Sequence, residues 1–298
     1  MQIGVVFPQT EIAEDAGAIR TYGREVERMG FTHVLAYDHV LGANTASRPH
    51  WQGPYTLETP FYEPFVLFSY LAGATERLAF VSGVFILTQR QTTLVAKQAA
   101  TLDVLVNGRL RLGIGTGWNE VEYEALGMPF ADRGQRIEEQ VEVMRALWTS
   151  PAVTFKGRQH TITDAGIKPL PVQRPIPIWF GGGSDRPHFG QKARDPIIRR
   201  IARIADGWIP QWQPDDRGRE LLEKFRGYCR EAGRDPARIG LEGRVNADRA
   251  DAPRWAQQVA AWRDIGATHL SINTMGYGLH GVDQHLRRLE EFRAALPA

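Results

Sequence analysis

The chain of 298 residues contains a single cysteine, Cys229, so a disulfide cannot form within it. It also lacks any apolar run approaching the roughly 18 residues that a membrane-spanning helix needs. Its net charge of +2 is too close to zero to indicate nucleic acid or an anionic membrane as a partner. The first residues read as a strand rather than as a charged leader before an apolar run, so we expect a soluble, cytoplasmic protein.

Metal-binding clusters and domain linkers are also missing from the sequence. No group of histidine, cysteine and acidic residues has metal-ligand spacing, so we expect no metal and disfavour a metal-dependent barrel hydrolase. No internal repeat or low-complexity tract divides the chain. With 43% hydrophobic and 23% charged residues, the composition is that of an ordinary globular protein. We therefore expect one domain over residues 1–298.

Short apolar runs alternate with amphipathic segments along the whole chain. The runs that read as strands are residues 2–7, 33–37, 78–87, 110–115, 176–180, 207–211, 239–245 and 269–273. The clearest helical faces between and after them lie within residues 19–29, 95–105, 137–147 and 286–292. Eight such strand-and-helix units predict an α/β fold, a (β/α)8 TIM barrel with insertion loops at its C-terminal rim. A doubly wound open sheet is the alternative, but regular units without a domain break favour closure.

Three segments interrupt this alternation, namely residues 41–60, 151–175 and 184–196. The first is rich in glycine and proline and includes Trp51, and the second contains several prolines. Long connections in compact domains usually cover a site. We expect all three segments to roof one pocket at the rim of the barrel.

The predicted strand at residues 110–115 ends in an unusual way. Its last positions alternate with glycine, at Gly113, Gly115 and Gly117, and polar or aromatic residues follow. A strand end without side chains suits a broad ligand that lies against bare backbone. Glycines required only by packing inside a barrel are the alternative. A dinucleotide-binding turn is disfavoured, because the spacing lacks the further glycine of that motif.

Other predicted strands also end in residues that could transfer a proton or bind a ligand. Asp38 and His39 follow the second strand, and a histidine at a barrel rim is suited to proton transfer near neutral pH. A structural Asp-His pair is the alternative. Ser82 and Gly83 interrupt a bulky run, which indicates a bulge or the close approach of a planar ligand. The fifth strand ends in three glycines, whose free N–H groups could cradle a phosphate or form only a flexible loop.

Taken in order, these motifs resemble the bacterial-luciferase-like family, and most closely its branch of F420-dependent oxidoreductases. The segments that carry the resemblance include Asp38-His39, Ser82-Gly83-Val84, Leu112-Gly113-Ile114-Gly115-Thr116-Gly117-Trp118, Gly181-Gly182-Gly183 and Ala205-Asp206-Gly207-Trp208. The resemblance is strong over residues 1–212 and loose beyond them. The combination is specific to the family, although no single motif is.

The resemblance implies a barrel that holds coenzyme F420, a deazaflavin, or alternatively FMN at the C-terminal rim. In relatives the third strand carries a bulge, often with a non-prolyl cis peptide, which falls on Gly83-Val84. The family's catalytic histidine falls on His39, and its ring-contacting acid falls on Asp38. Its cofactor contacts fall on Asp38, Ser82, Gly83, Val84, Thr116, Gly117, Asn119, Gly181, Gly182 and Gly183.

The implied function is hydride transfer by F420 to or from a small organic substrate. His39 would supply or take a proton, and Asp38 would hold the ring or orient the histidine. The alternative is a monooxygenase of two components, in which a separate reductase supplies reduced FMN. A member that binds a flavin without catalysis is a third possibility. Relatives are often homodimers, although no feature of this sequence identifies an interface.

One position departs from part of the family. The sugar-phosphate dehydrogenases of the family carry an acidic residue directly after the Thr-Gly pair, where this chain has Trp118. The departure argues against glucose-6-phosphate as substrate. We expect Trp118 and Trp51 to line the substrate pocket and to favour a flat or apolar substrate.

Overall fold

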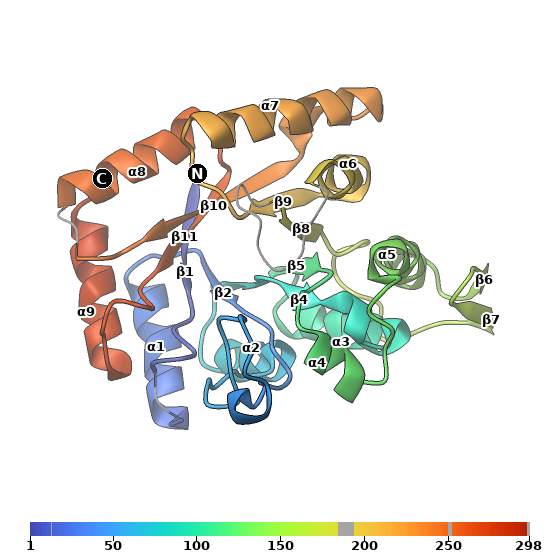
Figure 1. The fold of residues 1–298 in the computed structure, drawn as a ribbon, viewed down its shortest axis with the longest axis horizontal. Helices are drawn as coiled ribbons and strands as arrows, with labels where there is room; N and C mark the ends of the chain where they lie inside the picture. Colours follow the sequence, from blue (N-terminus) through green and yellow to red (C-terminus); the bar gives the residue numbers. More distant parts are fainter. Residues whose placement is uncertain (13, 184–193, 250–251, 297–298) are drawn as a thin grey trace.

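The computed structural model describes residues 1–12, 14–183, 194–249 and 252–296. Within these residues, eight parallel strands form a sheet in the order β3-β2-β1-β11-β10-β9-β8-β5, and pairing of β3 with β5 closes it into a barrel (Figure 1). The strands are β1 (Gln2–Val6), β2 (His33–Ala36), β3 (Ala79–Ser82), β5 (Leu110–Gly115), β8 (Ile178–Gly182), β9 (Gly207–Pro210), β10 (Gly240–Asn246) and β11 (His269–Asn273). The predicted TIM barrel is confirmed.

Each barrel strand is followed by a helix that covers the outside of the sheet. The helices after these strands are α1 (Ala16–Arg28), α2 (Pro64–Ala72), α3 (Thr92–Leu105), α5 (Arg133–Thr149), α6 (Arg194–Ile204), α7 (Asp216–Glu231), α8 (Ala252–Asp264) and α9 (Gly281–Ala294). Local chemistry fixes several helix starts. The Asp15 carboxylate, for example, accepts the N–H groups of Gly17 and Ala18 and so begins α1.

The interior of the barrel is filled in layers. Val6, Leu35 and Val81 lie side by side in the register of β1, β2 and β3, and all three are buried. They pack in one cluster with Trp179 and Ile209, which come from β8 and β9. Such a layer is typical of a closed (β/α)8 barrel, and it forms the base beneath the carboxyl ends of the strands.

A polar layer lies nearer the amino ends of the strands. Glu242 on β10 accepts hydrogen bonds from Arg111 at 2.6 Å and Ser271 at 2.6 Å, and it lies 3.1 Å from His33 Nε2. The carboxylate is 1% exposed, and burial opposes its ionisation. The charge of Arg111, together with the contacts of His33 and Ser271, nevertheless holds the pKa of Glu242 well below its usual range. An ion pair and hydrogen bonds to one carboxylate thus connect four strands inside the barrel.

The third predicted strand, residues 78–87, is not continuous. It divides into β3, β4 (Phe85–Ile86) and the 3-10 helix η2 (Leu87–Gln89), and β4 pairs with the end of β5. The Gly83–Val84 peptide between β3 and β4 is cis, as the resemblance implied. A Cβ atom at Gly113 would lie 1.9 Å from the Ser82 carbonyl oxygen, so this glycine is required by packing.

Residues 151–175 do not line the main cavity at the carboxyl ends of the strands, so that prediction was wrong. They contain the antiparallel hairpin of β6 (Val153–Lys156) and β7 (Thr161–Ala165), which projects beyond α5 in Figure 1. The segment connects a helix to the next strand, and such connections lie at the other end of a barrel. Of the third predicted loop, residues 184–193 lie outside the described residues.

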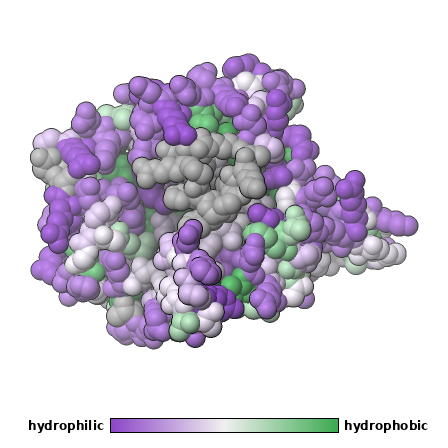
Figure 2. Space-filling view, in the orientation of Figure 1, coloured by the Kyte–Doolittle hydropathy of each residue, from purple (hydrophilic) through white to green (hydrophobic). Residues whose placement is uncertain are grey.

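One face of the molecule has a largely hydrophilic surface. Figure 2 shows hydrophilic residues over most of one face and hydrophobic residues in small separate groups. Exposed apolar side chains on neighbouring helices include Val66 and Tyr70 on α2 and Leu105 on α3. None of the described helices is both long and apolar enough to cross a membrane.

Candidate active site

A cavity of about 240 Å³ opens at the carboxyl ends of the strands. It is lined by Tyr37, Asp38, His39, Pro54, Tyr55, Gly83, Val84, Ile86, Gly115, Thr116, Gly117, Trp118, Gly181, Gly182, Ile197, Gln211 and Arg244. These residues come from the ends of the barrel strands β2, β3, β5, β8, β9 and β10, from β4, from α6 and from the loop at residues 41–60, which therefore covers the cavity as predicted. This end of a (β/α)8 barrel is where active sites are built.

Val84 packs between two strand ends that carry no side chains. A Cβ atom at Gly115 would lie 2.7 Å from Val84 Cγ2, and one at Gly181 would lie 2.7 Å from Val84 Cγ1. At Gly117, whose φ is +61°, a Cβ would lie 2.6 Å from Ile86 Cγ2. The glycines at the end of β5 thus leave room for the side chains of Val84 and Ile86. This contact favours the interpretation that packing inside the barrel requires these glycines. Val84 in turn gives the cavity an apolar wall.

Replacing Gly181 with alanine should destabilise the protein by about 1–3 kcal/mol, because the new methyl group overlaps Val84. Adding Val84→Ala should recover part of that loss, and urea unfolding of the single and double variants measures the coupling. Gly227→Ala on α7 is the matched control, since nothing lies within 4 Å of its added Cβ. Additive losses for the two substitutions would contradict the proposed packing.

His39 is held at the cavity by a buried carboxylate. Its Nδ1 lies 2.9 Å from Oε1 of Glu122, and the same oxygen accepts the Val40 N–H at 3.0 Å. Glu122 lies on α4 (Glu120–Ala125), and its side chain is 1% exposed. With Nδ1–H donated to the carboxylate, a neutral imidazole presents Nε2 as an acceptor. Among the described residues, Nε2 has no hydrogen-bond partner, so it is available to a bound molecule.

Aromatic side chains surround the His39 ring. The ring centroids of Tyr55 and Phe61 lie 4.8 Å from that of His39, and the centroid of Trp118 lies 5.7 Å away. Burial raises the pKa of Tyr55 to about 12, so its hydroxyl stays neutral at physiological pH. The ring centroid of Trp51 lies 5.7 Å from that of Trp118, and Trp51 itself does not line the cavity. The imidazole therefore lies among aromatic rings, with the Glu122 carboxylate as its polar contact.

Asp38 lines the cavity but does not orient His39. Its Oδ1 accepts a hydrogen bond from Arg90 at 2.6 Å, and its Oδ2 accepts the N–H of Ile86 at 3.0 Å. The carboxylate is therefore neutralised by Arg90 and fastens the end of β2 to β4. Glu122 has the orienting position that sequence reasoning gave to Asp38.

The structure brings most of the predicted site residues together. The cavity lining contains Asp38, His39, Gly83, Val84, Thr116, Gly117, Trp118, Gly181 and Gly182. Their roles toward a cofactor or substrate stay predictions.

Three predicted cofactor contacts lie outside the lining. The Ser82 hydroxyl is buried and donates to the Gly113 carbonyl oxygen at 2.8 Å. Asn119 caps α4, because its side chain accepts the Val121 N–H at 3.1 Å. Gly183 has a φ of +74°, and its added Cβ would lie 2.8 Å from the Trp208 ring. Each of these residues has a local structural reason for its identity.

Arg244 and Gln211 line the cavity although the sequence did not single them out. The Arg244 guanidinium lies over the Tyr37 ring at 5.2 Å and forms no ion pair with any described carboxylate. Tyr37 is itself fixed, since its backbone N–H and C=O both bond to the Gln9 amide. Among the described lining residues the Asp38 carboxylate is paired with Arg90, so the Arg244 guanidinium is a positive charge without a carboxylate partner in the lining. Such a site favours an anionic molecule.

Comparison with known proteins shows which family this chain resembles. The family model described as luciferase-like monooxygenase matches residues 1–296. An uncharacterized protein of Mycobacterium tuberculosis is 40% identical over 176 residues, which are 59% of this chain and 57% of that protein. An FMNH2-dependent dimethylsulfone monooxygenase of Pseudomonas putida is 29% identical over 170 residues, 56% of this chain and 43% of that protein. The matches thus span about half the length of these curated relatives.

A solved structure shares the whole fold. An F420-dependent secondary alcohol dehydrogenase, in complex with an F420-acetone adduct, superposes with a TM-score of 0.73 at 18% identity. The match covers 98% of both chains. At this identity the likeness establishes the barrel alone, whereas the family model covers nearly the entire sequence. The chain belongs to the luciferase-like monooxygenase family.

Proposed function

We propose that this protein is an oxidoreductase that uses coenzyme F420 for hydride transfer to or from a small organic substrate. The observation that carries the proposal is His39, which Glu122 holds with Nε2 free at the end of a barrel cavity. A histidine at this end of a (β/α)8 barrel would be suited to exchange a proton with a bound molecule. The alternative of a protein that only binds a flavin leaves this arrangement without a use.

The lining fits a flat, anionic heterocycle with a charged tail. Val84 offers an apolar surface against which a ring system would lie, and Arg244 offers a positive charge that no carboxylate of the described residues pairs with. Thr116 and Gly182 would supply polar contacts to the tail. When bound, the deazaflavin supplies the hydride chemistry, and the protein supplies binding, orientation and electrostatics.

The residues of the chain would divide the remaining work. His39 would take a proton at Nε2 or return one from it, while Glu122 keeps the opposite nitrogen occupied. Trp118 and Tyr55 would exclude water from the reacting atoms and favour a flat or apolar substrate. Asp38 would act through its bond to Ile86, which holds the β4 segment beside Val84.

A second candidate is a monooxygenase that uses reduced FMN delivered by a separate reductase. The curated relative from Pseudomonas putida is FMNH2-dependent, which favours this candidate. Both reactions would use the same cavity and the same histidine. Exposed apolar residues on α2 and α3 support the expected homodimer in either case.

Titration of the apo-protein with F420 and FMN, each oxidised and reduced, tests the proposal. We expect F420 to bind at least about tenfold more tightly than FMN, a difference of about 1.4 kcal/mol. Arg244→Gln should weaken F420 binding about tenfold or more, because the positive charge is lost. Arg230→Gln, an exposed position on α7, is the matched control. Preference for FMN would support the second candidate, and failure to bind either would overturn both.

A further inference from the structure

Helix α4 carries a second buried residue, Tyr123, directly after Glu122. The Tyr123 side chain is 1% exposed, and its ring packs edge-on against Phe130 with 5.1 Å between the ring centroids. Tyr123 does not line the active-site cavity. Its hydroxyl donates at 2.7 Å to the backbone carbonyl of Thr116, a residue that does line the cavity. A side chain outside the cavity thus holds part of the backbone that lines it.

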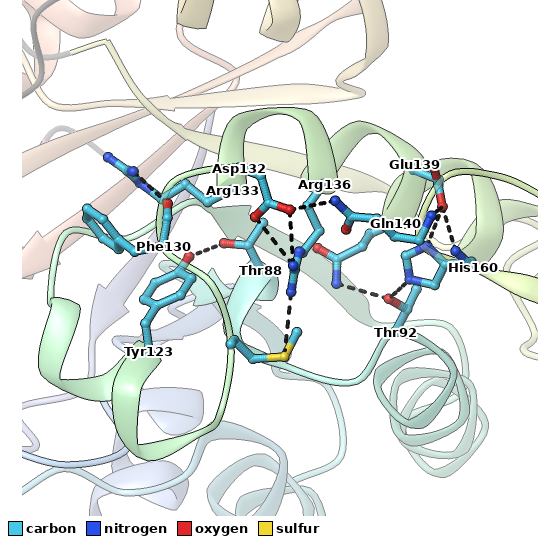
Figure 3. Close-up of polar contacts among 12 residues, drawn as sticks. Thr88, Thr92, Tyr123, Phe130, Asp132, Arg133, Arg136, Glu139, Gln140 and His160 are labelled. Carbon is cyan, nitrogen blue, oxygen red and sulfur yellow. Dashed lines mark hydrogen bonds and ion pairs between the residues drawn. The ribbon is translucent and has the colours of Figure 1, made fainter.

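The direction of each hydrogen bond at Tyr123 follows from the groups involved. A carbonyl oxygen can only accept, so the single phenol proton of Tyr123 is donated to Thr116. The hydroxyl of Thr88 on η2 also bonds to the Tyr123 oxygen, and Thr88 must therefore be the donor in that bond. Burial raises the pKa of Tyr123, so the phenol keeps its proton. Figure 3 shows Thr88 and Tyr123 joined in this way, with Phe130 beside the tyrosine ring.

The peptide bond between Thr116 and Gly117 has a fixed orientation as a result. This bond is trans, so its carbonyl and its N–H point in opposite directions. Because the carbonyl faces Tyr123, the Gly117 N–H points away from the tyrosine hydroxyl. Both Thr116 and Gly117 line the cavity and are half-buried. Among the described residues, neither the Gly117 N–H nor the Thr116 hydroxyl has a hydrogen-bond partner, so two adjacent donors are available to a bound molecule.

Adjacent residues of α4 act on two different strand ends of the cavity. Glu122 holds His39, which follows β2, and Tyr123 holds Thr116, which follows β5. The helix itself is fixed at its start, where the Asn119 side chain forms the N-cap. One helix of six residues therefore orients both the histidine and the pair of free donors before any ligand binds.

We propose that Tyr123 is a positioning residue for the cofactor. It orients the Thr116–Gly117 peptide so that the Gly117 N–H and the Thr116 hydroxyl donate to an oxygen of the bound molecule. This role rests on the proposed function, which supplies the identity of that molecule. Donors that are fixed before binding lose little conformational freedom when the ligand arrives, and this favours affinity. Tyr123 itself does not touch the ligand, because it lies outside the cavity lining.

Tyr123→Phe tests this role, because it removes the hydroxyl and keeps the ring against Phe130. We expect the Kd of the cofactor that the wild type prefers to rise about fivefold or more, the effect of losing one oriented hydrogen bond. Turnover at saturating cofactor should change little, since Glu122 still holds His39. Thr88→Val is the matched control, because it removes the other hydroxyl of the same buried chain and leaves the Tyr123 donor in place. Both variants should lose stability, but only Tyr123→Phe should lose cofactor affinity.

The backbone N–H signal of Gly117 in isotope-labelled protein gives a second readout, by nuclear magnetic resonance and without catalysis. In the apo-protein its chemical shift should change in Tyr123→Phe and stay near the wild-type value in Thr88→Val. Adding cofactor to the wild type should move the signal and slow its hydrogen exchange. Equal affinity of Tyr123→Phe and the wild type, or equal losses of affinity in both variants, would overturn the role of Tyr123 and leave the proposed function standing. A wild type that binds neither F420 nor FMN would overturn both together.

Discussion

Replacing His39 with alanine is expected to lower turnover about 100-fold or more, the usual contribution of a general acid or base. Affinity for the cofactor should change little, because Val84, Arg244 and the strand-end backbone remain. Steady-state kinetics and a binding titration of the same preparation measure the two effects separately. We expect this loss because Nε2 of His39 has no hydrogen-bond partner among the described residues and is therefore available to exchange a proton.

Two further variants make this expectation specific. His50→Ala removes an exposed histidine from the loop at residues 41–60 that does not line the cavity, and it should leave turnover unchanged. Glu122→Gln should lower turnover by a smaller factor, because the imidazole stays in place but loses the carboxylate that fixes its tautomer. Unchanged turnover in the His39→Ala variant would exclude the proposed proton transfer.

Replacing Glu242 with alanine should lower the free energy of unfolding by about 3–5 kcal/mol. The substitution leaves Arg111 and His33 as buried cationic or polar groups without their shared carboxylate. Urea unfolding measures the loss. Glu231→Ala is the control, because its ion pair with Arg199 is more than half exposed on both sides and should contribute less than about 1 kcal/mol.

The same carboxylate predicts a dependence on pH. The pKa of Glu242 is lowered in the folded protein, so its stabilisation is complete above the pKa of the unfolded chain, about 4.5. It is lost progressively as the pH falls below that value. The difference in stability between wild type and Glu242→Ala should therefore shrink in acid. A difference that stays constant from pH 7 to pH 3 would contradict this account.

The barrel was predictable because its strands are short apolar runs covered on the outside by amphipathic helices. The predicted run at residues 239–245, for instance, differs from β10 by one residue at each end. The break at Gly83 was less accessible, since an apolar run does not reveal where the backbone leaves the sheet. The segment at 151–175 was misplaced because its composition resembles that of a loop over a site, although its position before a strand argued otherwise.

The site was predicted in part for a similar reason. Residues at strand tips, such as His39 and Thr116, follow from the order of the elements. Their partners do not, because Glu122 lies 83 positions beyond His39 and meets it only through the fold. Arg244 sits inside a predicted strand, where nothing in the sequence separates a cavity-facing side chain from an outward one. Capping explains Asn119 better than a ligand does.

The seat of Val84 has a consequence for protein engineering. Its two methyl groups contact glycines of different strands, so the Val84 side chain is one replaceable part of the apolar cavity wall. Alanine at position 84 would deepen the cavity by the volume of two methyl groups without moving either strand. A larger residue would instead press on β5 and β8. The residue at position 84 would therefore limit how deeply a flat molecule enters the barrel. A library of variants at this position would change the depth of the cavity while the other lining residues stay the same.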